Sequence, residues 1–344
     1  MKCKGWRAVG LGLSAGMLGA LPAHAQTSVE LYGTADGGVR YQSNAAVGGG
    51  SVYTMNSNGY YSSNKLGFLG REDLGDGWYA RFQLESGFNL GNGQFDNTTN
   101  TLFNRQAYFG IGNKQYGALY LGRQYTIAHD IISIYDPYNF HFTPLIPLTQ
   151  ASDGTRNNDD MKYKDTIGPV MFELDNSFGG VPGDFNSGST RAAGFSYTAG
   201  PAQFGGVYGH RSVLSGTTYV GDTYYMVGAS YKIATVTLSG GFMAEDLENP
   251  HAAHGVTNNG FGGLNWYINP ALIFTGAYYQ TTVSNDKAGR RGLSVLSLAY
   301  LLSKRTTVYV ESDYTSYRHA VVSTLNTTGA SNQKAVTIGI DHLF

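Results

Sequence analysis

Few residues in this sequence have the types and spacing that catalysis or metal binding requires. Residues 12–16 (GLSAG) match the pattern of a serine nucleophile elbow, but that serine needs a strand-turn-helix context, which an apolar N-terminal segment does not offer. His251 and His254 stand three residues apart in a polar stretch, where no third ligand follows at a diagnostic spacing. The sequence after residue 25 contains no Walker A, HExxH or CxxC motif. We therefore expect no enzyme, no metal and no other cofactor.

The longest polar stretch, 125–156, combines charge with aromatic side chains and could line a binding site. Its aspartates, aromatic residues and prolines include Asp130, Asp136, Asp153, Tyr135, Tyr138, Phe140, Phe142, Pro137, Pro144 and Pro147. The prolines stiffen the stretch, and loops this long are usually functional or disordered. Two interpretations stay open: the acids face basic residues across a narrow passage, or the stretch is an exposed, variable loop.

The first 25 residues are predicted to be a cleaved signal peptide, which leaves residues 26–344 as one domain. Lys2, Lys4 and Arg7 precede an apolar stretch, 8–21, and Ala23-His24-Ala25 is a small-x-small cleavage site. Cleavage removes Cys3, the only cysteine, so no disulfide can form. It also leaves 20 of the 23 Lys and Arg residues against 24 Asp and Glu. This acidic balance argues against nucleic-acid binding.

The composition suits a chain whose outer surface meets lipid. There are 48 glycines, 26 tyrosines and only 9 prolines, and charged residues make up 14%, well below the roughly 25% of soluble domains. No segment after residue 25 has the 18 or so consecutive apolar residues of a membrane helix. A membrane protein without such helices must be a closed barrel, because only closure pairs every backbone polar group in the absence of water.

Alternating patterns predict strands from end to end. Val29, Leu31 and Ala35 alternate with polar residues, and the same period of two recurs near 82–85, 307–311 and 336–341. Seven short turns and eight longer polar stretches follow one another in alternation, which predicts sixteen strands. The turns lie near 75–77, 113–117, 165–168, 199–201, 232–234, 268–270 and 302–304, and the long loops at 42–61, 88–102, 125–157, 178–190, 212–220, 244–256, 282–290 and 317–332.

Several stretches resemble the general porins of Gram-negative bacteria, especially those of the β-proteobacterial and neisserial type. The resemblance implies an all-β transmembrane antiparallel barrel of sixteen strands, a homotrimer, and a third long loop folded into the lumen. A basic residue is usual in that family where Asp341 or Leu343 stands here. The matching stretches are VELYG (29–33), KLGFLGREDLG (65–75), LESGF (84–88), NRQAYFG (104–110), YGALYLGRQY (116–125), LSKRT (302–306) and IGIDHLF (338–344).

The resemblance also suggests which residues form a pore constriction. Arg105 and Arg156 match wall arginines of related porins, Lys65 stands where a basic residue is common, and Arg123 belongs to the GRQY element. Strand alternation disagrees for Arg123, because it shares parity with two outward leucines, and a β-bulge or the strand end would have to turn it inward. Each cation could alternatively form an ordinary surface ion pair.

Asp130 and Asp136 of the third loop are the acids expected to face Arg105 and Arg156 across the lumen. The four cations then outnumber these acids, which predicts a slight preference for anions. Phe344, by the same resemblance, is the terminal aromatic that the outer-membrane assembly machinery reads, although it also fits an interfacial girdle.

We therefore expect an outer-membrane porin, exported through the periplasm, that carries small hydrophilic solutes and ions by passive diffusion. Its expected partners are two further copies of the chain, outer-membrane lipid and lipopolysaccharide, and the assembly machinery. A solute-selective porin is the first alternative. A barrel enzyme and an adhesive barrel are the others, although no triad of catalytic groups is visible.

Overall fold

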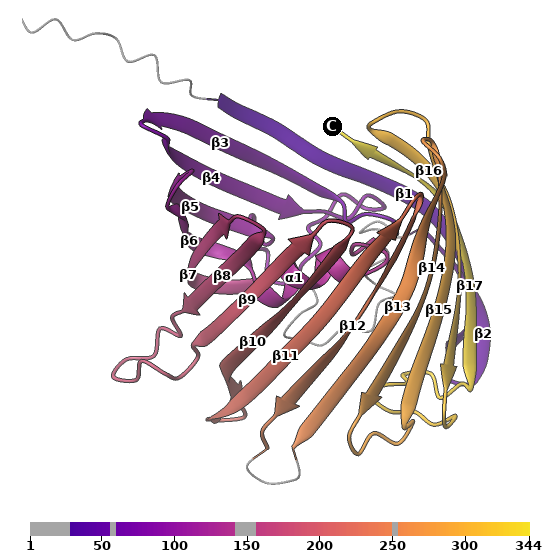
Figure 1. The fold of residues 1–344 in the computed structure, drawn as a ribbon. Coiled ribbons are helices and arrows are strands. Elements are labelled where there is room, and N and C mark those ends of the chain that lie inside the picture. Colours follow the sequence, from indigo (N-terminus) through magenta and orange to yellow (C-terminus); the bar gives the residue numbers. More distant parts are fainter. Residues whose placement is uncertain (1–27, 56–59, 142–155, 250–253) are drawn as a thin grey trace, which may run out of the picture.

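In the computed structural model, which describes residues 28–55, 60–141, 156–249 and 254–344, the chain forms one antiparallel sheet that closes on itself (Figure 1). The predicted signal peptide, Phe142, Asp153 and His251 lie outside the described residues. The elements are β1 (Ser28–Ala46), β2 (Gly49–Met55), β3 (Lys65–Gly75), β4 (Trp78–Gly87), β5 (Gln106–Asn113), β6 (Gly117–Tyr125), α1 (Ile127–Tyr135), β7 (Arg156–Ile167), β8 (Val170–Ser177), β9 (Thr190–Ala199), β10 (Ala202–Ser215), β11 (Thr218–Ile233), β12 (Val236–Leu247), β13 (Gly255–Asn269), β14 (Leu272–Val283), β15 (Arg290–Leu301), β16 (Thr306–Tyr317) and β17 (Asn332–Leu343).

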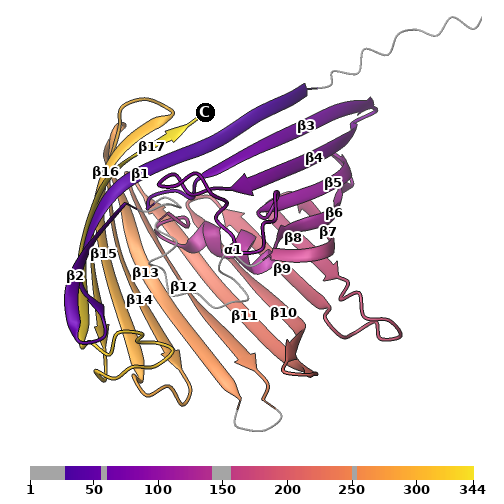
Figure 2. The same ribbon diagram turned by 180° about the vertical axis from the view of Figure 1, so that it is seen from behind.

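The seventeen strands occupy sixteen positions around the barrel, as the sequence predicts. One edge of β1 pairs with β17, which closes the ring. The other edge pairs first with β3, over residues 28–34, and then with β2, over residues 39–46. β2 and β3 therefore follow one another along a single strand position. Figure 2 shows β2 beyond β3, at the far end of β1.

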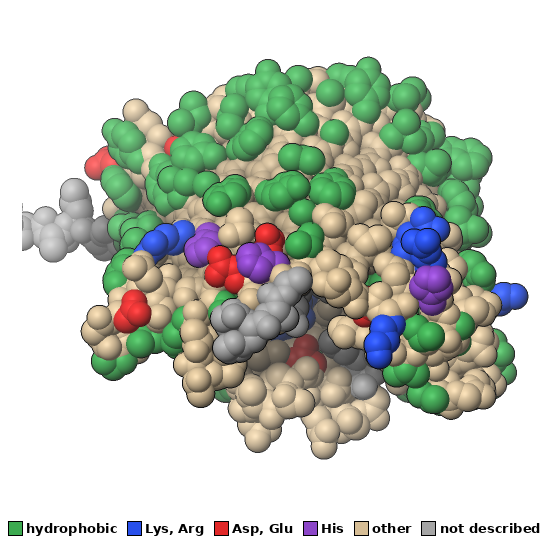
Figure 3. Space-filling model, turned by 90° about the horizontal axis from the view of Figure 1, so that it is seen from below, with side chains coloured by type: hydrophobic (Ala, Val, Ile, Leu, Met, Phe, Trp, Pro, Cys, Tyr) green, Lys and Arg blue, Asp and Glu red, His purple; other side chains and the backbone are tan. Residues whose placement is uncertain are grey.

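The strand alternation is the one expected from the sequence. On β1, Thr34, Asp36 and Arg40 are buried inside the barrel, whereas Val29 and Leu31 are 62% and 55% exposed on the outside. The same outward apolar residues recur on the other strands, and hydrophobic side chains cover the outer wall in Figure 3. A belt of this extent is what contact with lipid hydrocarbon requires.

Two predicted long loops are wrong. In the predicted loop 42–61, β1 continues to Ala46 and forms a hairpin with β2. The predicted loop 212–220 is a tight connection, because β10 ends at Ser215 and β11 begins at Thr218. Gly216, with φ at +65°, makes that turn possible. Both segments mix turn formers such as Gly and Ser with strand formers such as Val, Tyr and Thr, so their composition fits a hairpin as well as a loop.

The interior is crossed by the segment that follows β6. Thr126 caps α1 by accepting a hydrogen bond from the backbone N–H of His129 (3.2 Å). The apolar face of α1, from Ile127 to Tyr135, is fully buried against β9 to β12. Glycines on that wall leave room, since a Cβ on Gly194 would stand 2.5 Å from Ile127 and one on Gly228 would stand 2.6 Å from Tyr135. Both ribbon views place α1 within the ring of strands.

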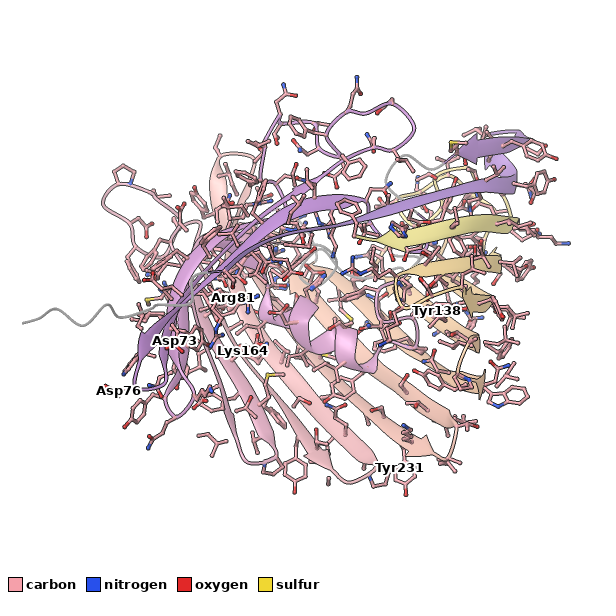
Figure 4. The ribbon with its side chains drawn as sticks, turned by 90° about the horizontal axis from the view of Figure 1, so that it is seen from above. Asp73, Asp76, Arg81, Tyr138, Lys164 and Tyr231 are labelled. Carbon is pink, nitrogen blue, oxygen red and sulfur yellow. The ribbon has the colours of Figure 1, made fainter. Side chains whose placement is uncertain are left out.

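Beyond α1 the chain is fixed to the opposite wall. Asn265 of β13 donates a hydrogen bond to the carbonyl of Pro137 (2.7 Å). The hydroxyl of Tyr138 donates to the carbonyl of Thr275 on β14 (3.0 Å). In the view along the barrel, Arg81 and Lys164 lie on one side of α1 and Tyr138 on the other (Figure 4). Among the described residues, no helix has the length and hydropathy of a membrane span.

Candidate functional site

All four predicted cations line one cavity. Lys65 begins β3, Arg105 precedes β5, Arg123 lies near the end of β6, and Arg156 begins β7. Because neighbouring strands of the ladder β3 to β7 end together, these side chains converge at the loop end of the barrel. Their cavity has a volume of about 1120 Å³. Within the described ranges, Asp96 is the one carboxylate that lines it with them.

Arg123 reaches this cavity through an irregularity in the strand ladder. The register between β6 and β7 shifts between Gly122 and Gln124, so that two residues of β7 stand opposite Arg123 alone. Gly122 adopts a φ of +131° there. The guanidinium of Arg123 donates to the carbonyl of Asn104 (2.7 Å) and to the side-chain oxygen of Asn158 (2.5 Å). A bulge of this kind re-aims a side chain that regular alternation would turn outward.

Tyr125 joins two of the cations to the first turn of α1. Its hydroxyl oxygen accepts hydrogen bonds from Arg105 and from Arg156, both at 2.6 Å. The guanidinium of Arg156 also lies over the tyrosine ring, 4.2 Å from its centroid. His129 stacks on the same ring at 3.8 Å, and Phe140 packs against His129 at 4.5 Å. Charge, ring stacking and hydrogen bonding thus hold the wall and the loop together.

The carboxylate of Glu85, on β4, partly neutralises the positive charge of the four cations. It accepts a hydrogen bond from Nε of Arg105 (2.8 Å) and lies 3.9 Å from the ammonium of Lys65. Arg105 also lies 3.8 Å from Asp96 and is nearly buried. A buried guanidinium needs such partners because its desolvation is costly. Neither Glu85 nor Tyr125 was among the predicted residues of this site, although Glu85 has the same inward parity as Gln83 on β4.

The expectation that Asp130 faces Arg105 or Arg156 is wrong. Asp130 forms an ion pair with Lys162 of β7 at 2.9 Å. Burial would raise the pKa of Asp130, but Lys162 and His129 lower it below its ordinary value. The orientation follows from the packing of α1, because burying its apolar face against β9 to β12 turns Asp130 toward β7. Lys162 could have been noticed from its inward parity with Asp160 and Lys164.

Asp136 also has partners other than the predicted arginines. Its carboxylate accepts hydrogen bonds from the hydroxyl of Tyr279 (2.5 Å) and from the backbone N–H of Phe140 (2.9 Å). Burial raises its pKa to about 6, although these hydrogen bonds act in the opposite direction. Asp136 therefore stabilises the turn after α1 and ties it to β14, on the far side of the barrel from Arg105.

A second, smaller cavity of about 330 Å³ lies on the other side of this turn. Ser133, Asn139 and His141 line both cavities. His141 stacks on Tyr61 at 4.0 Å, and its Nδ1 lies 3.0 Å from the tyrosine carbonyl. Burial lowers the pKa of His141 to about 4. Apart from Asp136, the described lining of the second cavity carries no acid, lysine or arginine; Ser230, Thr237, Ser239, Asn265, Thr275 and Ser297 are among it.

Phe344, the predicted assembly signal, lies at the seam where the last strand, β17, pairs with the first strand, β1. Its backbone exchanges two hydrogen bonds with Gly33 on β1, at 3.0 and 3.1 Å. Its ring lies over Gly33, where a Cβ would stand only 2.2 Å from the ring. The ring remains 40% exposed, on the outer surface.

Comparison with known proteins gives one family and several relatives. The model of a family described as Gram-negative porin matches residues 12–320. An outer membrane porin protein of Bordetella pertussis is 28% identical over 96% of this chain and 98% of its own length. A major outer membrane protein P.IB of Neisseria meningitidis serogroup B is 26% identical over 86% of this chain and 90% of its own.

Two solved structures share the fold. An anion-selective porin from Comamonas acidovorans superposes with a TM-score of 0.80, at 21% identity, over 93% of this chain and 100% of that chain. OmpT, an outer membrane protein of Vibrio cholerae, gives a TM-score of 0.67 at 15% identity, over 92% of this chain and 98% of that chain.

Proposed function

The chain belongs to the Gram-negative porin family, and from that premise we propose that the cavity lined by Lys65, Arg105, Arg123 and Arg156 makes its channel favour small anions. The protein is an outer-membrane porin that forms a water-filled channel for passive diffusion of small hydrophilic solutes and ions. The observation that carries the proposal is the charge of the cavity, in which four cationic side chains meet one described carboxylate. Even with Glu85 and Asp96 both counted against them, the group keeps an excess of two positive charges.

The physical basis is the geometry of the field. A narrow passage with a low-dielectric wall concentrates the field of its fixed charges, whereas open water weakens it. At physiological salt the Debye length is about 8 Å, so these cations act on a solute inside the cavity but not in the bulk. Arginine keeps its charge at every relevant pH. Anion selectivity in the Comamonas porin of the same fold agrees with this proposal.

The segment from Thr126 to His141 forms, in this proposal, the part of the third loop that narrows the passage. It is held at β6 through the stacking of His129 on Tyr125, at β7 through the ion pair of Asp130 with Lys162, and at β13 and β14 through Pro137 and Tyr138. A segment fixed on two facing walls cannot swing out of the lumen as an external loop would. Asp130 and Asp136 then serve as its anchors, and the cationic wall provides the selectivity.

A solute-selective channel is the second candidate, and the neutral cavity beside His141 favours it. Hydroxyl and amide groups suit an uncharged polar solute, and a binding site of that kind would make the flux of that solute saturate. A barrel enzyme is a weaker alternative, because family and fold point to a channel. We propose that the protein has no catalytic activity.

The remaining partners are part of the same proposal. Two further copies of the chain complete a homotrimer, residues 1–25 direct export, and Phe344 is recognised during assembly. Exposed apolar residues on β1 and β3, such as Leu31 and Phe68, offer the subunit contact. Lipopolysaccharide surrounds the loop end of the barrel.

A reversal-potential measurement tests the anion preference. The purified protein is placed in a planar bilayer between KCl solutions of different concentration. We expect a reversal potential displaced toward the equilibrium potential of chloride, and displaced further as total salt falls. A potential at zero or toward that of potassium would overturn the proposal.

A further inference from the structure

The two walls of the lumen beside α1 differ in chemistry. One wall, from β11 to β15, holds the cavity of about 330 Å³ described above, which we call the neutral cavity. The other wall, from β4 to β7, holds a third cavity of about 190 Å³, which Arg81, Lys162 and Lys164 line. Seen from the turn end, Arg81 and Lys164 lie on one side of α1, and Tyr138, which lines the neutral cavity, lies on the other (Figure 4). A solute that passes here therefore meets both positive charge and hydroxyl groups.

Four hydroxyl groups in the neutral cavity have no hydrogen-bond partner among the described residues. They belong to Ser230, Thr237, Ser239 and Tyr267. Ser230 and Ser239 stand directly opposite one another on β11 and β12, and Thr237 lies on the same inward face of β12 as Ser239. These side chains are only partly buried, so their hydroxyl groups are open to a solute.

The amide and hydroxyl groups next to them hold the loop segment instead. Asn265 donates a hydrogen bond to the carbonyl of Pro137 (2.7 Å) and accepts one from the hydroxyl of Thr275 (2.8 Å). The hydroxyl groups without partners are therefore the ones that a solute can engage. Each donates one hydrogen bond and accepts others, so a carbon chain that carries several hydroxyl groups complements them. The volume of the neutral cavity is also within the range of small-molecule sites, about 300–1,000 Å³.

The neutral cavity adjoins the cationic cavity, which is the one of about 1120 Å³ that holds the four cations. Ser133, Asn139 and His141 line both. The side chain of Asn139 is exposed and has no partner among the described residues, so a solute in either cavity can bond to it. Lys65 stands at the loop end of β3, whereas Thr237 is the second residue of β12 after a short turn. A solute that enters from the loop end therefore meets the cations first and the hydroxyl groups next.

We propose that the two cavities together bind small polyhydroxylated carboxylates, the class of the sugar acids. The carboxylate lies in the cationic cavity, where Arg105 and Arg156 offer charge-assisted hydrogen bonds. The carbons that carry hydroxyl groups extend past Asn139 to Ser230 and Ser239. A simple carboxylate engages only the cationic cavity, and an uncharged polyol engages only the neutral one. The inference rests on the proposed preference for anions and adds a second determinant, the hydroxyl groups of the solute.

Block of the chloride current through single channels tests the inference, because a solute bound in the lumen obstructs the current. Three probes are added in KCl at neutral pH to the protein in planar bilayers. Gluconate carries both a carboxylate and several hydroxyl groups, butyrate carries the carboxylate alone, and sorbitol has the chain length of gluconate without its charge. The half-blocking concentration of each probe is measured. We expect gluconate to block the unsubstituted protein at a lower concentration than either butyrate or sorbitol.

Variants then separate the hydroxyl groups from the size of the solute. The double variant Ser230→Ala, Ser239→Ala removes two hydroxyl groups from the neutral cavity, and Ser294→Ala, Ser312→Ala removes two from the outer face of β15 and β16 as a matched control. A neutral hydrogen bond is worth about fivefold in affinity, so the first variant should raise the half-blocking concentration of gluconate roughly tenfold or more. Thr237→Val, which removes one hydroxyl group at nearly constant shape, should raise it about fivefold. The control should leave it unchanged.

Three results would overturn the inference. The first is equal block of the unsubstituted protein by gluconate and butyrate. The second is a block by gluconate that neither cavity variant weakens, since the size of the solute would then explain it. The third is a block by sorbitol at the same concentration as gluconate, which would make this a site for neutral solutes. Failure of the proposed function is distinguishable, because it would appear in KCl alone, as a reversal potential at zero or toward that of potassium, before any probe is added.

Discussion

The ring of Tyr125 lies flat on the imidazole of His129, with centroids 3.8 Å apart and planes inclined by 10°. Tyr125 is the last residue of β6 and His129 belongs to the first turn of α1, so this contact joins the barrel wall to the segment that crosses it. Burial lowers the pKa of His129, with Arg156 and Arg105 acting in the same direction against Asp130. The imidazole thus stacks on the ring that also supports two guanidinium groups.

Replacing Tyr125 by Phe should weaken this junction without removing the ring stack. The hydroxyl accepts from two guanidinium groups, and the loss of a charged hydrogen bond costs about 2 kcal/mol. We expect a lower denaturant midpoint in detergent and noisier single-channel current. Tyr163→Phe is the matched control, because its hydroxyl donates to the carbonyl of Tyr116 (2.8 Å) and to the carboxylate of Asp165 (3.4 Å), and neither of these contacts involves a guanidinium group or α1. Equal losses in both variants would contradict the role given to Tyr125.

Replacing Arg105 by Ser should shift the reversal potential toward cations and raise conductance modestly. The substitution removes a charge from the cavity and leaves Lys65, at 3.9 Å, as the one cation among the described residues that pairs with Glu85. The effect should be larger in low salt, where screening is weaker. Lys287→Ser, in an outer connection, is the control and should change selectivity much less. A reversal potential that responds to Lys287 and not to Arg105 would show that selection occurs at the mouth.

Replacing Asp136 by Asn should change how stability depends on pH. The folded-state pKa of Asp136 is raised to about 6, above the ordinary value near 4. Its stabilising contribution is therefore present below pH 4 and is lost as pH rises through 6. Relative to the unsubstituted protein, Asp136→Asn should gain up to about 3 kcal/mol at pH 8 and little at pH 4. Urea unfolding of both proteins in detergent at pH 4 and pH 8 measures the difference in their free energy of unfolding. An equal gain in stability at both pH values would show that the pKa of Asp136 is not raised.

Gly122→Ala should displace Arg123 from the cavity. An added Cβ would stand 2.3 Å from the carbonyl oxygen of Ala107 and 2.9 Å from the Cα of Tyr108, both backbone atoms. We expect a loss of about 3 kcal/mol in stability, together with reduced anion selectivity. Gly200→Ala provides the control, since Gly200 also has a positive φ, +57°, but nothing within 4 Å. It should cost roughly 1 kcal/mol and leave selectivity unchanged.

Deletion of Phe344 should impair assembly in cells more than stability in detergent. The residue contributes two backbone hydrogen bonds at the seam, and its ring is still partly exposed. Gel mobility before and after heating, on membranes and on refolded protein, separates the two effects. Heat-modifiable oligomers at normal abundance in the membrane would count against a recognition role.

The sequence alone was sufficient to predict the features of the barrel that follow from the two-residue alternation of the strands and from the turns between them. Alternation placed Val29 and Leu31 outside and Asp36 inside, and the short turns delimited all but a few strands. It could not show that β2 would pair with the end of β1, because Gly-rich and Ser-rich segments carry no apolar register. The partners of Asp130 and Asp136 depend on how α1 rotates against glycines on three other strands, which no local pattern records.

The pairing of β1 with both β17 and β3 sets the order of events during biogenesis. Thr34 faces Leu343 on one edge and Lys65 on the other, so the ring has a single seam between the earliest and the latest strands to be synthesised. Contacts of such sequence separation form slowly, because a long loop must close first. The chain must therefore be fully synthesised and exported before it can close. Until then its apolar belt has no partner, and factors that prevent aggregation must protect the unfolded chain.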